Sequence, residues 1–248
     1  MNIFSAAVIG LAMALAPAAQ AAELRVLAGG AMTSVWADLQ PKYEQASGHK
    51  LEIFFGTTPN LIKEATSGKV FDLGIVPVEV MQDAAARARF AAGATIDVAR
   101  VGLGVAVRAG AARPDITTPD TLKASLIRAQ SIATLPASAA GAQVMKTFER
   151  LGVSDAIKGK LQAKAAPAEV VQAVAKGEAE LGVFLVNVLT APGLDVVGPF
   201  PAELQQEIVF TAAPALVTTQ AEAAKALIAY LKSPEAIAII KARGMTPG

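Results

Sequence analysis

The feature that most constrains the fold is a pattern that the chain repeats: a short apolar run, a loop of small residues, then a stretch with apolar residues at helical spacing. The first half shows these runs and helical stretches in turn at 24–28, 33–46, 51–55, 59–67, 72–76 and 78–89. Such alternation predicts parallel strands joined by crossover helices. The sequence therefore indicates an α/β protein.

The N-terminus has the pattern of a signal peptide. Ala6 to Ala16 is an uncharged apolar run, and Ala19-Gln20-Ala21 supplies the small-x-small motif that precedes cleavage. The run is too short to span a membrane as a helix. Residues 1–21 are therefore predicted to be removed on export to the periplasm, so that the mature chain begins at Ala22. The segment has no Lys or Arg, which leaves a buried N-terminal helix as the alternative.

Composition excludes several classes of function. Lys and Arg number 22 against 21 Asp and Glu, a formal charge of +1, so the basic excess of a nucleic-acid-binding protein is absent. The chain has no cysteine and one histidine, His49, which excludes thiol nucleophiles and any site that needs two histidines. No cofactor or metal is expected, and His49 is interpreted as a surface residue.

Three loops that link an apolar run to a helix form a candidate anion site, at 28–34, 56–60 and 136–141. The start of a helix leaves backbone N–H groups unpaired and carries a partial positive charge. Small side chains let an anion approach those groups, and threonine and serine add hydroxyl donors. The candidate residues from these loops are Gly30, Met32, Gly56, Thr57, Thr58, Ser138 and Gly141. Ordinary capping of the helices is the alternative interpretation of each loop.

Arg100 is the one charged candidate for the site. It lies just before an apolar run that begins at Val101, and a buried arginine beside a cleft can hold a carboxylate with two hydrogen bonds. The alternative is a structural ion pair with Asp97.

From Leu24 to Gly248 the chain resembles the periplasmic molybdate-binding protein family. The segments that carry the resemblance are Ala28-Gly29-Gly30-Ala31-Met32-Thr33, Phe55-Gly56-Thr57-Thr58-Pro59-Asn60-Leu61, Phe71-Asp72-Leu73-Gly74-Ile75, Gly177-Glu178-Ala179-Glu180-Leu181-Gly182 and Tyr230-Leu231-Lys232-Ser233-Pro234-Glu235-Ala236.

The resemblance implies a type II periplasmic-binding-protein fold. That fold has two lobes, each a mostly parallel sheet flanked by helices, with the ligand cleft between them. Lobe 1 is expected to hold residues 22–100 and 208–248, and lobe 2 residues 101–207. The family also implies that the protein, as a monomer, closes around its ligand and docks on the membrane permease of an ABC transporter.

The resemblance further implies which residues contact the ligand. The serine of the first loop falls on Ala31, the second-loop donors on Gly56, Thr57 and Thr58, and the remaining family positions on Ala140, Val170 and Leu185. Ala31 and Leu185 lack the hydroxyls that molybdate binders have there, and a site without those donors is expected to disfavour molybdate. A small anion, either another oxyanion or a carboxylate, is therefore the predicted ligand.

An enzymatic alternative stays open. The segments 99–107 and 197–205 resemble a divergent branch that includes a periplasmic isomerase of unsaturated tricarboxylates of the aconitate type. Proton transfer beside a carboxylate needs a positioned base and a cationic group. The three loops offer hydroxyl groups only, with Arg100 as the candidate cation, so binding without turnover is the preferred interpretation.

Overall fold

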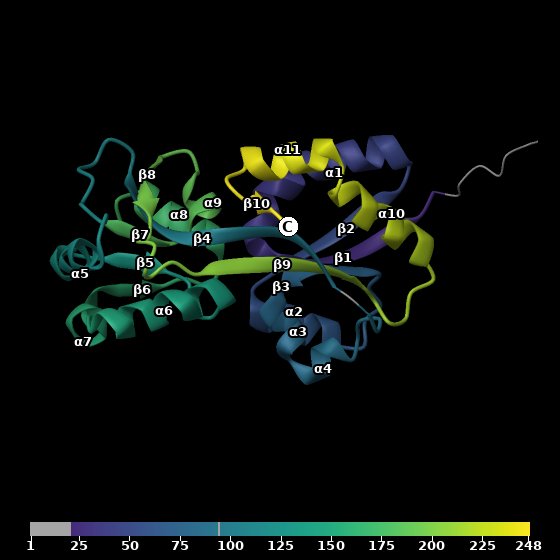
Figure 1. Ribbon diagram of the computed structural model, residues 1–248, viewed down its shortest axis with the longest axis horizontal. Helices are drawn as coiled ribbons and strands as arrows, with labels where there is room; N and C mark the ends of the chain where they lie inside the picture. The colour runs from purple at the N-terminus through teal and green to yellow at the C-terminus, as the bar shows by residue number, and fades with distance from the viewer. Residues whose placement is uncertain (1–20, 94) are drawn as a thin grey trace, which may run out of the picture.

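The computed structural model describes residues 21–93 and 95–248, so the predicted signal peptide lies outside the described residues except for Ala21. Two groups of helices and strands lie side by side along the long axis of the molecule (Figure 1). The long strand β4 (Ile96–Arg108) and the strand β9 (Glu207–Pro214) connect them. Within the described residues, no helix has the length and apolar character needed to cross a membrane.

The first sheet has the strand order β2-β1-β3-β9-β4. Strands β2 (Lys50–Gly56) and β3 (Leu73–Pro77) pair in parallel with β1 (Glu23–Gly29), and β9 runs antiparallel between β3 and β4. The short strand β10 (Thr246–Pro247) pairs with β4. The helices of this part are η1 (Gly30–Met32), α1 (Thr33–Ser47), α2 (Thr58–Thr66), α3 (Val78–Gln82), α4 (Ala84–Arg87), α10 (Ala221–Leu231) and α11 (Pro234–Ala242).

The second sheet has the order β4-β7-β5-β6. Strand β5 (Ile132–Thr134) pairs in parallel with β6 (Leu161–Ala163) and β7 (Leu181–Leu185), while β8 (Leu194–Pro199) runs antiparallel to β4. Its helices are α5 (Pro119–Arg128), α6 (Ala139–Leu151), α7 (Ser154–Ile157), η2 (Lys158–Lys160), α8 (Pro167–Ala175) and α9 (Val186–Leu189). Each sheet thus carries three parallel strands, and the two-lobed α/β fold predicted from the sequence is confirmed.

Strand β4 belongs to both sheets. Its first half, Ile96–Gly102, pairs with β9, and its second half, Leu103–Arg108, pairs with β7 and β8. At the crossing, Gln205 accepts from Leu103 N at 2.8 Å and donates to Leu103 O at 2.9 Å. We call the part with the first sheet lobe 1 and the part with the second sheet lobe 2. The residue boundaries at 100/101 and 207/208 stay a prediction.

Most predicted elements are present, with one interrupted helix. The helix expected at 78–89 is divided into α3 and α4, because the carboxylate of Asp83 accepts a hydrogen bond from Ala86 N and begins a new helix there. Trp36 and Tyr43 are 1% and 2% exposed within the core of lobe 1. Their burial shows that the apolar face of α1 lies against the first sheet.

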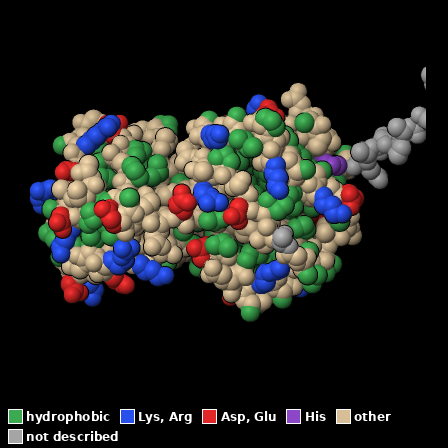
Figure 2. Space-filling model, in the orientation of Figure 1, with side chains coloured by type: hydrophobic (Ala, Val, Ile, Leu, Met, Phe, Trp, Pro, Cys, Tyr) green, Lys and Arg blue, Asp and Glu red, His purple; other side chains and the backbone are tan. Residues whose placement is uncertain are grey.

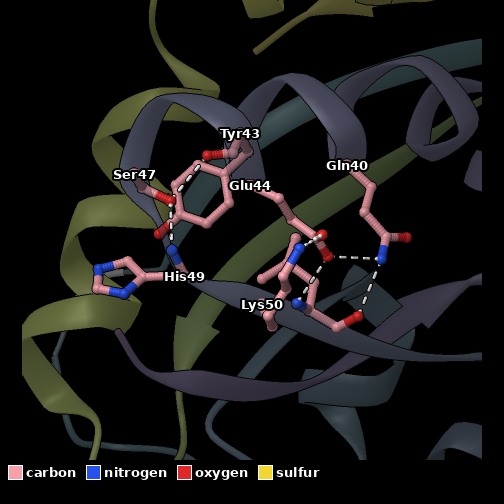
Figure 3. A network of polar contacts seen from close by, with 7 residues as sticks. Gln40, Tyr43, Glu44, Ser47, His49 and Lys50 are labelled. Carbon is pink, nitrogen blue, oxygen red and sulfur yellow. Dashed lines mark hydrogen bonds and ion pairs between the residues drawn. The ribbon is translucent and has the colours of Figure 1, made fainter. Parts of the chain in front are cut away.

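The carboxylate of Glu44 joins α1 to the start of β2 (Figure 3). It accepts from Lys50 Nζ at 2.8 Å, from Gln40 Nε2 at 3.0 Å and from Leu51 N at 3.0 Å. The hydrogen bond from Lys50, with those from Gln40 and Leu51, lowers the pKa of Glu44 to about 2. These bonds stabilise the ionised carboxyl group only in the folded chain.

Glu44→Gln is therefore expected to lower the free energy of unfolding by about 1–2 kcal/mol at neutral pH, the scale of a hydrogen bond to a charged group. Because the native pKa is depressed, the unfolded chain takes up this proton first on acidification, near its ordinary pKa of about 4.3. The difference in the free energy of unfolding between wild type and variant should be constant near neutral pH and should shrink as the pH falls from about 5 toward 2. Urea unfolding at several pH values measures it, and a difference that stays constant down to pH 2 would contradict the assignment.

Candidate functional site

A cleft lies between the two lobes where strands end and helices begin. Most residues of this inner pocket come from the carboxyl ends of β1, β2 and β3 in lobe 1 and of β5, β6 and β7 in lobe 2, the edge at which open parallel sheets bind ligands. Strand β9 adds Ile208 and Phe210. The lining residues are Gly29, Gly30, Ala31, Gly56, Thr57, Thr58, Pro77, Leu135, Ser138, Ala139, Ala140, Pro167, Phe184, Leu185, Ile208 and Phe210.

The first turn of α6 presents its amides to this pocket. Ser138 is the N-cap: its hydroxyl accepts from Gly141 N at 3.0 Å and donates to Leu135 O at 2.9 Å. Ala139 N donates to Thr58 Oγ1 at 3.1 Å. The amide of Ala140 has no hydrogen-bond partner among the described residues. A donor at the positive end of a 13-residue helix is thus left for a ligand.

The start of α2 supplies a free hydroxyl. Thr57 occupies the N-cap position of this helix, yet its side chain makes no capping hydrogen bond. The same residue lines the pocket. Most N-cap threonines use their oxygen to satisfy the helix. The hydroxyl of Thr57 is instead available to a molecule in the cleft.

Two hydrogen bonds cross the cleft directly. One is the bond from Ala139 N in lobe 2 to Thr58 Oγ1 in lobe 1. The other runs from Asn187 Nδ2 at the start of α9 to Ala31 O, at 2.8 Å. Asn187 is 4% exposed, and its Oδ1 is buried without a hydrogen-bond partner. The lobes are therefore in contact in a closed arrangement. At this contact the side-chain oxygen of Asn187 is buried without a hydrogen-bond partner.

An outer chamber of about 490 Å³ adjoins the inner pocket, whose own volume is about 30 Å³. The two spaces share Gly30, Ala31, Gly56, Thr57 and Pro167. The inner space holds about one or two waters. The outer chamber has the size of a small-molecule site. Together they suit a ligand with one compact polar end and a larger body.

The walls of the inner pocket carry no charged side chain, since Asp, Glu, Lys, Arg and His are all absent from its lining. Helix starts and hydroxyls are the polar groups there, so the pocket favours negative charge without an ion pair. In the outer chamber Arg243 is the one lining cation, and it is paired with Asp38 at 2.6 Å. Across the described residues no group of three or more His, Asp or Glu side chains could hold a metal ion.

Most of the residues predicted from the sequence meet in the cleft. Those that line it are Gly30, Ala31, Gly56, Thr57, Thr58, Ser138, Ala140 and Leu185. The Ser138 hydroxyl makes both of its hydrogen bonds within its own turn and caps α6. The main-chain donor at Ala140 is therefore the group that this loop offers.

Four predicted residues do not line either cavity, each for a physical reason. Met32 and Val170 have no exposed surface and pack in the core. Gly141 lies against Leu135 O, with its N–H bonded to Ser138. Arg100 lies on β4 with Asp97 at 3.7 Å, the structural ion pair that was the alternative interpretation.

Sequence reasoning missed two polar or backbone features of the cleft. Pro167 begins α8 after the short strand β6, and Asn187 follows β7 by two residues. Both lie at the same kind of strand-to-helix junction as the three predicted loops. The strand-to-helix pattern could have indicated Asn187, because this residue lies two positions after the predicted site residue Leu185. The apolar walls formed by Phe184 and Phe210 gave no signal beyond that of ordinary strands.

The comparisons with known proteins agree with this architecture. A family model described as bacterial extracellular solute-binding protein matches residues 24–246. An aconitate isomerase of Pseudomonas sp. is 33% identical over 232 residues, covering 90% of this chain and 87% of the relative. The molybdate-binding protein of Azotobacter vinelandii is 29% identical over 243 residues, covering 93% and 92%.

Solved structures show the same fold. The periplasmic molybdate-binding protein of Azotobacter vinelandii superposes with a TM-score of 0.72 at 20% identity, covering 90% of this chain and 98% of that one. The structure has a cleft between two mixed α/β lobes, its relatives match over nearly their full length, and the family model spans almost the whole described chain. The chain therefore belongs to the bacterial extracellular solute-binding protein family.

Proposed function

We propose that this protein captures a small organic anion, a carboxylate, by closure of its two lobes and delivers it to the permease of an ABC importer. The observation that carries the proposal is the donor set of the inner pocket: the Ala140 amide, the Thr57 hydroxyl and the helix starts behind them, with no charged side chain. Such donors stabilise an oxyanion group and leave the rest of the ligand to the outer chamber. Export after cleavage at Ala21 would place this binding in the periplasm.

The shape of the site favours an organic carboxylate over a tetrahedral oxyanion such as molybdate. A compact dianion needs donors on all its faces, and the positions Ala31 and Leu185 supply no hydroxyl. Phe184 and Phe210 add apolar side chains to the wall. A carboxylate end in the inner pocket with a carbon skeleton in the outer chamber uses both spaces.

A second candidate is an isomerase of an unsaturated tricarboxylate, which the 33% identity to an aconitate isomerase favours. That reaction moves a proton next to a carboxylate and so requires a base near the ligand. No carboxylate, imidazole or amine lines the inner pocket. The outer chamber adds Arg243 as a cation for a distal carboxylate, although Asp38 already pairs with it. We therefore rank binding first.

A ligand screen separates these proposals. Thermal unfolding is followed with cis-aconitate, trans-aconitate, citrate, molybdate and sulfate, because a ligand of the native state raises its stability by about 2.7 kcal/mol at a concentration 100 times Kd. The carboxylates should raise Tm and molybdate should not. Incubation with each aconitate isomer, followed by chromatography, tests turnover. Stabilisation by molybdate alone would overturn the carboxylate proposal, and interconversion of the isomers would replace binding by catalysis.

Thr57→Val is expected to weaken carboxylate binding by about 1–3 kcal/mol, roughly 5- to 150-fold in Kd, because it leaves a ligand oxygen without its donor. Stability should hardly change, since the Thr57 hydroxyl caps nothing. Thr118→Val is the matched control. Thr118 caps α5 by accepting from Thr121 N, so its loss should lower stability by about 0.5–2 kcal/mol and leave affinity unchanged. Calorimetry and urea unfolding of both variants measure the contrast, and equal affinity for wild type and Thr57→Val would remove Thr57 from the site.

A further inference from the structure

The single histidine lies against the residue expected to start the mature chain. Ala22 N donates to His49 Nδ1 at 3.1 Å, and Ala22 O accepts from Lys50 N at 2.8 Å. Both backbone groups of Ala22 are thus fixed at the start of β2. In Figure 2 the histidine lies at the surface, next to the point where the described chain begins. His49, interpreted from the sequence as a surface residue, thus also holds the backbone of Ala22.

Cleavage after Ala21 changes the chemistry of this contact. Hydrolysis of the bond between Ala21 and Ala22 adds water, leaving a carboxylate on Ala21 and a primary amine on Ala22. An amide nitrogen has no lone pair to donate to a metal, whereas an unprotonated amine does. After cleavage, the nitrogen atoms of an amine and an imidazole face each other across 3.1 Å, and a metal ion that binds both displaces the proton of the amine.

The spacing suits a shared metal ion. With metal–nitrogen bonds of about 2.0–2.1 Å, two ligand atoms lie about 2.9 Å apart at a right angle and about 3.3 Å apart in a tetrahedron. We propose that the mature α-amino group of Ala22 and Nδ1 of His49 chelate a divalent transition metal, with Cu²⁺ bound most tightly. This site rests on the proposed export and cleavage, and it is separate from the interlobe cleft.

The surroundings leave room for the ion and its remaining ligands. An open hollow of about 490 Å³ is lined by Ala22, His49 and the segment 219–223. Within that segment Glu222 is paired with Lys225 at 2.8 Å and its side chain is 87% exposed, so the carboxylate is free to turn toward the hollow. Figure 3 shows the imidazole directed away from Glu44 and Lys50. The Lys50 ammonium is thus kept apart from the ion by its own ion pair with Glu44.

The backbone of His49 is hydrogen-bonded, and an aromatic ring lies beside its imidazole. His49 N donates to Ser47 Oγ at 3.1 Å, and the Tyr43 ring lies 6.2 Å from the imidazole, centroid to centroid. Tyr43 itself packs against Tyr230 at 5.2 Å. A fixed ring beside a fixed chain start loses little conformational entropy on metal binding.

The test uses the full chain, exported with its own leader and purified without a tag. Intact mass establishes the first residue, and competition calorimetry with Cu²⁺ measures affinity while electron paramagnetic resonance detects coordinated nitrogens. The comparison variants are His49→Ala and a mature chain lengthened by one glycine before Ala22. Because the chain holds one histidine and no cysteine, the background of other strong Cu²⁺ ligands is low.

Each variant should lose at least tenfold in Cu²⁺ affinity, and His49→Ala should lose the imidazole signal in the resonance spectrum. Equal affinity in the wild type and either variant would overturn the chelate, leaving only the general copper binding of a free N-terminus. A mature chain that begins anywhere other than Ala22 would also overturn it. Anion binding in the cleft is measured on the same samples, so its presence or absence is decided independently.

Discussion

Gly141→Ala is expected to be the most destabilising single-methyl change near the cleft, lowering the free energy of unfolding by about 3 kcal/mol. A β-carbon at this position would lie 1.7 Å from Leu135 O and 2.8 Å from Pro136 Cα. Both obstacles are backbone, and Leu135 is 1% exposed, so the turn cannot move aside into solvent. For a chain of this size the loss corresponds to a fall in Tm of roughly 6–12 °C.

The same substitution should also weaken ligand binding. The first turn of α6 carries the free Ala140 amide, and any shift of that turn displaces the donor. Gly159→Ala is the matched control, because a β-carbon there meets nothing within 4 Å and stability should stay within about 0.5 kcal/mol. Urea unfolding of both variants measures the difference. Equal stability of the two would show that the close approach of Gly141 to Leu135 can relax.

The sequence predicted the strand-to-helix junctions best where a long apolar run precedes small residues. The loops at 28–34 and 56–60 both follow seven-residue strands, and both line the cleft. Strand β6 has three residues, Leu161–Ala163, and only one of them is strongly apolar. Its sequence therefore shows no recognisable alternation of apolar and polar residues. The junction before Pro167 was consequently missed, although it forms the same kind of site wall.

Side-chain orientation was the part that pattern alone could not supply. The family correspondence fell on Val170, but Pro167 lines the cleft while Val170, one turn further along α8, faces the core. Ser138 was expected to donate to a ligand, yet the geometry of its turn uses both hydrogen bonds of the hydroxyl. Such outcomes depend on rotamers and on tertiary neighbours such as Leu135, which a one-dimensional pattern does not contain.

The pairing of distant segments was equally hidden from the sequence. Arg100 could be placed on a strand, but its position beside Asp97 rather than in the cleft depends on the register shift between Asp97 and Ala99 in the pairing of β4 with β9. The contact between Ala22 and His49 joins residues 27 positions apart and follows from the register of β1 with β2. Fold class is thus encoded in local periodicity, whereas the chemistry of individual side chains is decided by sheet register.

Gly30→Leu is expected to disfavour the closed form selectively and so to weaken ligand binding by about 5- to 150-fold, or about 1–3 kcal/mol. Gly30 in lobe 1 faces Pro167 in lobe 2: a β-carbon on Gly30 would lie 3.6 Å from Pro167 Cγ and 3.5 Å from Gly56 O. Alanine therefore fits at ordinary contact distance, and the branched end of leucine does not. Opening of the lobes relieves the overlap. The substitution should therefore destabilise the closed form relative to the open form and leave the free energy of unfolding of the lobes nearly unchanged.

The matched pair Gly30→Ala and Gly30→Leu tests whether ligand binding requires this closure. Alanine should keep wild-type affinity, while leucine should lower affinity with little change in urea stability. Small-angle scattering of the ligand-free leucine variant should show a larger radius of gyration than that of wild type, because the two interlobe hydrogen bonds at Thr58 and Asn187 cannot form when the lobes are apart. Unchanged affinity of the leucine variant would mean that the ligand binds to one lobe, and that the contact between Gly30 and Pro167 has no part in holding it.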